Sequence, residues 1–182
     1  MNKKKDLVGI IVGGGPAPGI NGVISSAAIE AIKEDKQVLG IVGGFKSLFD
    51  GNKKAAIPLK IDDISRIHND GGSILRTARD YPDRLQEKFK VLMATLKHFG
   101  VKYLITIGGE GTLFMASWIE KAARGSISVV HVPKTIDNDI PLPGGASRRH
   151  SIRRLLLRAN GAALRLGGRP AAPRPERPRV LL

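Results

Sequence analysis

The chain has 182 residues, a length that suits one domain with one sizeable core. It contains no cysteine, which excludes disulfide bonds and Cys-ligated metal sites. Its formal net charge of +14 is unevenly placed: residues 1–145 carry 15 Lys, 5 Arg and 15 acidic residues, whereas residues 146–182 carry 10 Arg and one acidic residue. Since most of the excess lies at the end of the chain, the charge argues against nucleic-acid binding by the body.

The first apolar run of the chain is short. It extends over Leu7–Val12, which is too short for the apolar core of a signal peptide, and no stretch is long enough to span a membrane. We therefore expect a cytoplasmic protein without a membrane partner.

Apolar runs and amphipathic stretches alternate along residues 7–133. Continuous β-branched runs that end in glycine predict buried parallel strands, and apolar residues at helical spacing predict helices between them. The predicted strands are 7–12, 37–42, 101–107 and 127–133, and the predicted helices are 20–33, 85–99 and 112–124. This alternation predicts an α/β fold with a Rossmann-like, mainly parallel sheet and flanking helices.

Two glycine-rich turns follow predicted strands, at Gly13–Asn21 and at Gly108–Thr112. Such a turn can direct backbone N–H groups and a helix N-terminus at a phosphate, or it can simply permit tight strand–helix packing. Glu110 lies among the second set of glycines. It suits a Mg²⁺ ligand beside a phosphate, and it equally suits a residue that stabilises the N-terminus of the next helix.

A third segment, Val132–Ile140, follows the last predicted strand and carries Asp137 and Asp139. Phosphoryl transfer needs carboxylates of this kind to accept a hydroxyl proton and to hold Mg²⁺, although Asp-Asn-Asp is also common in turns. The carboxyl ends of parallel strands meet at one edge of a sheet, so the three segments predict a single shared site.

The identity and order of these segments resemble the phosphofructokinase family. The matching motifs are Gly14–Asn21, Gly71–Arg79, Gly108–Thr112 and Pro133–Ile140, and the resemblance extends from residue 6 to about residue 145. It implies that residues 1–145 form the N-terminal, nucleotide- and magnesium-binding domain of that fold, incomplete at its end. In the full-length family this domain belongs to a homo-oligomer.

The resemblance also implies the roles of individual residues. Asp137 would take the proton from the 1-hydroxyl of fructose 6-phosphate, Thr135 would hold the sugar or the transferred phosphoryl group, and Asp139 would support the charge and the water shell of the metal. Glu110 would be the Mg²⁺ ligand, at a position where the family usually has Asp. The residues implied to bind the phosphoryl donor are Gly14, Gly15, Arg79, Arg84, Gly109, Gly111, Thr112 and Lys134.

The implied reaction is phosphoryl transfer from ATP to fructose 6-phosphate, giving fructose 1,6-bisphosphate. Gly111 leaves room for ATP, while Lys134 is the residue that pyrophosphate-dependent members carry, and within the family this combination favours ATP. Two alternatives stay open: a pyrophosphate-dependent enzyme, and a non-catalytic nucleotide-binding module with a basic, RNA-binding tail.

The composition changes after residue 145. From Ala146 onward the chain has Arg but no Lys, has no Phe, Tyr or Trp, and ends in a Pro-rich stretch of the kind that is disordered. Since the resemblance stops at the same point, we expect a change of reading frame near residue 145. The resemblance places the clamp for the sugar 6-phosphate beyond this point, and phosphoryl transfer depends on positioning, so we expect the chain as written to lack kinase activity.

Overall fold

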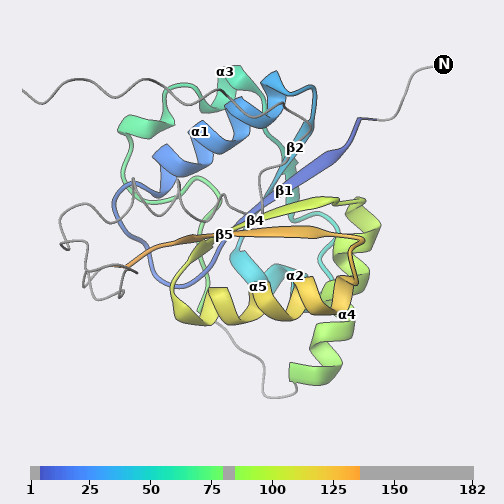
Figure 1. Ribbon diagram of the computed structural model, residues 1–182. Coiled ribbons are helices and arrows are strands. Elements are labelled where there is room, and N and C mark those ends of the chain that lie inside the picture. The colour runs from blue at the N-terminus through green and yellow to red at the C-terminus, as the bar shows by residue number, and fades with distance from the viewer. Residues whose placement is uncertain (1–4, 80–84, 136–182) are drawn as a thin grey trace, which may run out of the picture.

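The computed structural model describes residues 5–79 and 85–135. These residues form a five-stranded sheet in the order β3-β2-β1-β4-β5, with helices on both faces (Figure 1). The strands are β1 (Leu7–Val12), β2 (Gln37–Ile41), β3 (Ala56–Pro58), β4 (Tyr103–Gly108) and β5 (Ser128–Pro133). The helices are α1 (Ile20–Lys33), α2 (Gly44–Phe49), α3 (Ile61–Ile64), α4 (Leu85–Phe99) and α5 (Glu110–Ala123), together with the 3₁₀ turn η1 (Ile67–Asn69).

Strand β1 is the centre of the sheet. It pairs in parallel with β2 and with β4, β5 pairs in parallel with β4, and only β3 is antiparallel, against β2. Five of the six residues of β1 are buried, as expected for a strand that is covered on both faces. The predicted α/β fold with a mainly parallel sheet is confirmed.

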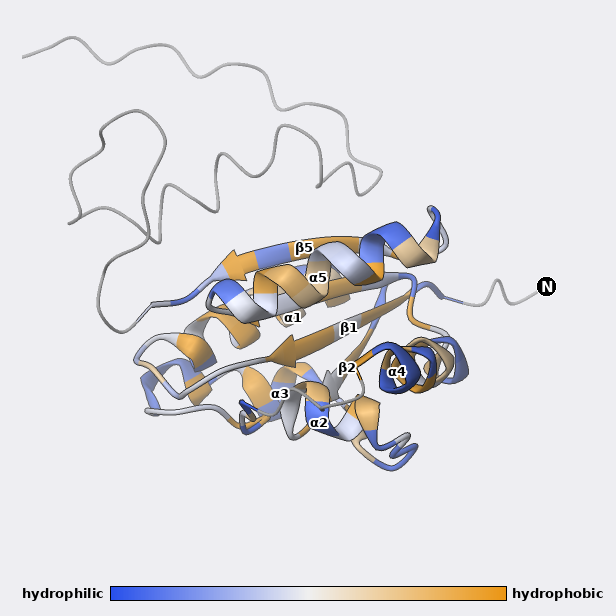
Figure 2. Ribbon diagram, turned by 90° about the horizontal axis from the view of Figure 1, so that it is seen from below, coloured by the Kyte–Doolittle hydropathy of each residue, from blue (hydrophilic) through white to orange (hydrophobic). Residues whose placement is uncertain are grey.

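The side chains on the two faces of β1 belong to two separate hydrophobic clusters. Val8, Ile10 and Val12 pack with α1 on one face, and Ile11 packs with α2, α4 and α5 on the other. This arrangement gives three layers, and Figure 1 shows α1 and α3 on one side of the sheet and α2, α4 and α5 on the other. Figure 2 shows that β1 and β5 are largely hydrophobic, while α4 carries many hydrophilic residues.

The long elements agree with the sequence prediction, and the short ones were not predicted. Helices α1 and α4 and strand β1 have the predicted bounds, whereas α5 begins at Glu110, two residues before its predicted start. The segment between β2 and α4 holds α2, β3, α3 and η1, none of which the periodicity indicated. The predicted domain boundary at residue 145 and the tail at 146–182 lie outside the described residues. No helix of the described part is both long enough and apolar enough to cross a bilayer.

Candidate functional site

The turns that follow β1 and β4 lie beside the end of β5, at the carboxyl edge of the sheet (Figure 1). The backbone N–H of Gly13 donates to Ile107 O at 2.8 Å, which joins the first turn to the end of β4. The N–H of Lys134 donates to Gly108 O at 2.8 Å, which joins the end of β5 to the second turn. The glycine-rich segments predicted to share a site therefore lie side by side.

The packing of Thr112 accounts for the absence of a side chain at Gly13 and at Gly108. The Thr112 side chain is 2% exposed and lies between the first and second turns. A Cβ at Gly108 would stand 2.6 Å from the Thr112 Cβ, and a Cβ at Gly13 would overlap the Thr112 side chain. Close packing of α5 against both turns thus depends on the missing side chains at these two positions.

Two cationic side chains converge on the first turn. The Lys134 ammonium donates to Gly15 O at 2.6 Å, and the Arg79 guanidinium lies so close to Gly15 that a Cβ there would be 2.5 Å from its Nη2. Burial, together with the neighbouring Arg79 charge, lowers the pKa of Lys134. Among the described residues neither cation forms an ion pair, so this place attracts an anion.

The backbone donors available to an anion differ from those the sequence suggested. The Gly13 N–H is occupied by Ile107 O, and the Gly14 N–H donates to Ala78 O at 3.0 Å. Gly14 instead supplies the left-handed turn, with φ of 78°, that lets the chain pass beneath Lys134. The N–H groups of Gly13 and Gly14 are therefore already paired within the chain, and among these three glycines only the Gly15 N–H forms no hydrogen bond with a described residue.

Helix α5 contributes a second set of donors. The N–H groups of Glu110, Gly111 and Thr112 lie in its first turn and so have no partner within the helix, and the N-cap residue, Gly109, has no side chain that could cap them. The N-terminal end of the helix dipole adds a favourable potential for an anion at the same place. Gly111 leaves the approach to these groups open because it has no side chain.

Glu110 is the one predicted metal ligand that the structure describes. It is exposed and lies in the first turn of α5. Within residues 5–79 and 85–135, no three or more His, Cys, Asp or Glu side chains are grouped so that they could hold a metal ion. Mg²⁺ commonly takes only one or two carboxylates and completes its shell with phosphate oxygens and water, so a lone Glu beside a phosphate site fits that metal.

The predicted acceptor side is largely outside the described residues. Thr135 is partly exposed and directly follows Lys134, at the edge where the turns meet. Arg84, Asp137 and Asp139 lie outside the described ranges, so their roles remain predictions.

Segment 70–79 was expected to supply Arg79, but the contacts that hold the segment in place were not predicted from the sequence. Ala78 forms a parallel bridge with Gly13, which carries Arg79 to the first turn, and the N–H of Gly43 donates to Leu75 O at 2.9 Å. Asn21, at the start of α1, holds the other end of this segment through its side chain. The available signal was Asn21 itself, because an amide side chain among the mainly apolar buried positions of α1 requires hydrogen-bond partners from elsewhere in the chain.

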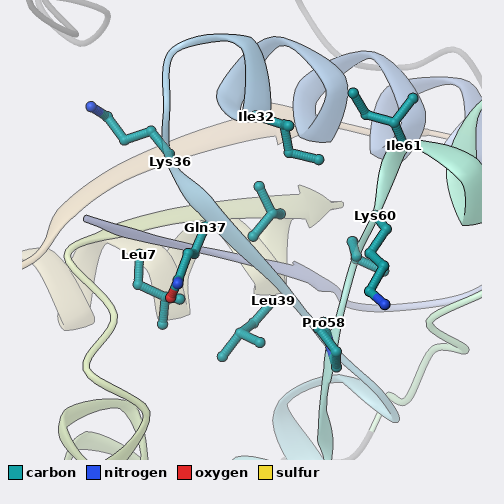
Figure 3. A pocket seen from close by; sticks show the side chains of 10 residues that line it. Leu7, Ile32, Lys36, Gln37, Leu39, Pro58, Lys60 and Ile61 are labelled. Atoms are coloured by element: carbon teal, nitrogen blue, oxygen red, sulfur yellow. The ribbon is translucent and has the colours of Figure 1, made fainter. Parts of the chain in front are cut away.

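A shallow pocket lies elsewhere on the molecule (Figure 3). Its lining includes Leu7 and Gln37 from the amino ends of β1 and β2, Ile32 from α1, and Pro58 from β3. The candidate site is at the opposite, carboxyl ends of the same parallel strands, so this pocket is separate from it.

A parallel sheet with glycine turns, a free helix N-terminus and two cations at its carboxyl edge defines a phosphate-binding α/β domain. The phosphofructokinase family model matches residues 7–143, which is most of the chain. The chain belongs to the phosphofructokinase family.

Individual relatives agree with this assignment. The chain is 56% identical over 138 residues to a pyrophosphate–fructose 6-phosphate 1-phosphotransferase of Thermotoga maritima, covering 76% of this chain and 33% of the relative. It is 40% identical to an ATP-dependent 6-phosphofructokinase of Mycobacterium bovis, covering 73% and 38% respectively. The crystal structure of Pichia pastoris phosphofructokinase in the T-state matches the fold with a TM-score of 0.70 at 24% identity, covering 76% of this chain and 16% of that one. The chain spans about a third of the length of the curated relatives it matches.

Proposed function

We propose that this chain contains the phosphoryl-donor half of a 6-phosphofructokinase site, and that the whole protein phosphorylates the 1-hydroxyl of fructose 6-phosphate. The observation that carries the proposal is that Lys134 and Arg79 converge on Gly15, in the same turn whose Gly13 packs against Thr112 in the first turn of α5. These groups offer positive charge and backbone N–H donors at one edge of the sheet, which is what a diphosphate requires. We propose fructose 6-phosphate as the acceptor because the chain belongs to the phosphofructokinase family.

The donor is pyrophosphate or ATP, and the observations divide between them. The absence of a side chain at Gly111 leaves room for ATP, the donor expected from the sequence. However, Lys134 projects into the site, where it reaches Gly15 O. The relative named for pyrophosphate is also 56% identical, against 40% for the ATP-dependent one. We therefore propose pyrophosphate as the first candidate donor and ATP as the second.

Each group would have a distinct task in the transfer. Arg79 and Lys134 would neutralise the donor phosphates, and the N–H groups of Gly15 and of the first turn of α5 would fix their orientation. Glu110 would hold Mg²⁺, which when bound offsets the charge that develops on the transferred group. Asp137 would accept the proton of the 1-hydroxyl as the new phosphate ester forms, and Asp139 would support it.

Calorimetric titration of the 182-residue chain with pyrophosphate and with ATP, each with Mg²⁺, tests the donor site. We expect pyrophosphate to bind more tightly than ATP, and the R79A and K134M variants to bind both more weakly. Binding that is equal in all three proteins would contradict the proposed site. A coupled assay of fructose 1,6-bisphosphate formation should show no turnover by this chain alone, because the clamp for the sugar phosphate is expected in the part that the relatives have in addition.

Three further points are proposals of the same kind. Residues 1–145 would form one domain, residues 146–182 would arise from a change of reading frame, and the whole protein would be a cytoplasmic homo-oligomer. Reading the nucleotide sequence across codons 140–190 in all three frames tests the second point. A frame that resumes a phosphofructokinase pattern would support it, and the absence of any such frame would make the arginine-rich tail genuine.

A further inference from the structure

Asn21 occupies an unusual place for a polar side chain. It lies in the first turn of α1 and is 2% exposed, among helix positions that are otherwise mainly apolar. Burial of an amide is costly unless its hydrogen-bonding groups are satisfied. The side chain of Asn21 is satisfied by partners about 50 residues away along the chain.

All the partners of the Asn21 amide belong to one segment. Nδ2 donates to Asp70 O at 3.1 Å and to Gly71 O at 3.3 Å, while Oδ1 accepts the N–H of Ile74 at 2.9 Å. Both polar atoms of one side chain thus hold the beginning of segment 70–79 against α1. The Asn21 side chain thus satisfies main-chain groups of residues 70–74 that a neighbouring strand or helix would satisfy in regular secondary structure.

The rest of the segment is held at two further points before it reaches the candidate site. Leu75 is fully buried, and its carbonyl accepts the N–H of Gly43 at the end of β2. The carbonyl of Ala78 then accepts the N–H of Gly14 at the end of β1. Arg79, the next residue, extends its guanidinium beside Gly15.

We infer that Asn21 is a positioning residue for the phosphoryl donor, because it fixes segment 70–79 and thereby places the Arg79 guanidinium against Gly15. This inference rests on the proposed function, since it takes Arg79 as a donor-binding residue. Asn21 does not contact the donor in this arrangement. Asn21 acts through the backbone of residues 70–78. That backbone is held first by α1, then by the end of β2 and last by the end of β1.

The test is a double-mutant cycle on pyrophosphate binding by the 182-residue chain. The proteins are the unsubstituted chain, N21A, R79A and the double variant N21A/R79A. Residues that support a binding group typically change affinity about 10-fold, so N21A should weaken binding by that order. If Asn21 acts through Arg79, N21A should have no further effect in the R79A background.

Thr95 provides the matched control. It is a buried residue, 4% exposed, whose hydroxyl donates to Val91 O at 2.8 Å on α4, on the opposite face of the sheet. T95V removes a buried hydrogen bond without touching segment 70–79, so it should lower stability while leaving pyrophosphate affinity unchanged. N21D is the second Asn21 variant in case N21A does not fold, because it keeps the acceptor for the Ile74 N–H and loses only the two donated bonds.

Amide hydrogen exchange gives a readout that does not depend on ligand. The N–H groups of Gly43 and Gly14, which donate to Leu75 O and Ala78 O, should exchange faster in N21A or N21D and at the normal rate in T95V.

A second measurement follows the NMR signal of the Arg79 Nε–H during addition of pyrophosphate. The signal should shift in the unsubstituted chain, and in N21A it should shift only at higher pyrophosphate concentrations.

The outcomes separate the inference from the proposed function. Equal losses of affinity from N21A with and without Arg79, or a similar loss in T95V, would overturn the positioning role and leave the donor site standing. Unchanged exchange at Gly14 and Gly43 would overturn it as well. If the unsubstituted chain does not bind pyrophosphate or ATP, the proposed function itself fails.

Discussion

Lys134, which follows β5, connects the end of that strand to the turn that follows β1. Its ammonium donates to Gly15 O and lies 3.5 Å from where a Cβ of Gly14 would be. Desolvation and the Arg79 charge both disfavour the protonated form of Lys134, and for that reason its pKa is lowered. A bound anion would reverse this effect, since it would stabilise the ammonium.

The K134M variant should bind pyrophosphate more weakly, by roughly 10-fold or more. The physical reason is the loss of a charge-assisted contact to phosphate, which is worth about 1.5–3 kcal/mol. The measurement is calorimetric titration at neutral pH, with K121M as the control. Lys121 is an exposed residue near the end of α5, so equal losses in the two variants would indicate a general charge effect and contradict the assigned role.

The G108A variant should unfold more easily. A Cβ at this position would stand 2.6 Å from the Cβ of the buried Thr112, so either α5 or the end of β4 must move. Overpacking of this kind costs about 1–3 kcal/mol. Chemical denaturation followed by circular dichroism measures the change, and an unaltered free energy of unfolding would show that α5 adjusts without cost.

At the scale of elements, the long strands and helices could be predicted because each has a local pattern that matches its place in the fold. β1 is a continuous apolar run since both of its faces are covered, and α4 ends at Phe99, before Gly100, which adopts φ of 76°. The short elements α2, β3 and α3 could not be predicted. β3 is three residues long and exists through its pairing with β2, which no local pattern records.

The candidate site was predicted to a similar extent. The positions of the glycine turns follow from the strands that they end, so their convergence was foreseeable from topology. The bonding of each amide was not foreseeable, because it depends on which neighbour lies beside it. Gly14 illustrates this point, since its N–H is taken by Ala78, a residue 64 positions away in sequence.

A substitution in helix α1 tests whether its glycine has a structural reason. Gly22 has nothing within 4 Å of where a Cβ would be, in contrast to Gly108. G22A should therefore raise the free energy of unfolding by about 0.5–1 kcal/mol, because alanine loses less conformational freedom in a helix. The same denaturation experiment compares it with G108A, and a destabilised G22A would imply that this part of α1 is covered in the whole protein.

At the scale of the whole molecule, acid should weaken the fold through His131 on β5. Partial burial lowers the pKa of His131 to about 4, and its Nδ1 lies 2.9 Å from the hydroxyl of the buried Thr106. The unfolded chain binds a proton near pH 6.5 and the folded chain only near pH 4, so the unfolded state carries more protons between these values. Stability should therefore fall as the pH drops from about 6.5 to about 4, by at most about 3 kcal/mol.

Urea denaturation at pH 7.5 and at pH 4.5 measures this effect. The difference in free energy of unfolding between the two pH values should shrink in H131N, which cannot be protonated there. H68Q is the control because it replaces an exposed histidine. A difference of the same size in H131N as in the unsubstituted chain would assign the acid sensitivity to other groups.

The strand order has a consequence for how the chain is made. Because β1 lies between β2 and β4, its second edge stays open until residues 103–107 are synthesised, as in the pairing of Val8 with Tyr103. A ribosome that adds about 5–20 residues per second would release β4 several seconds or more after β1. Throughout that interval β1, five of whose six residues are buried in the folded chain, can pair along one edge only. Its exposed edge is the point at which a chaperone would act and at which aggregation would start.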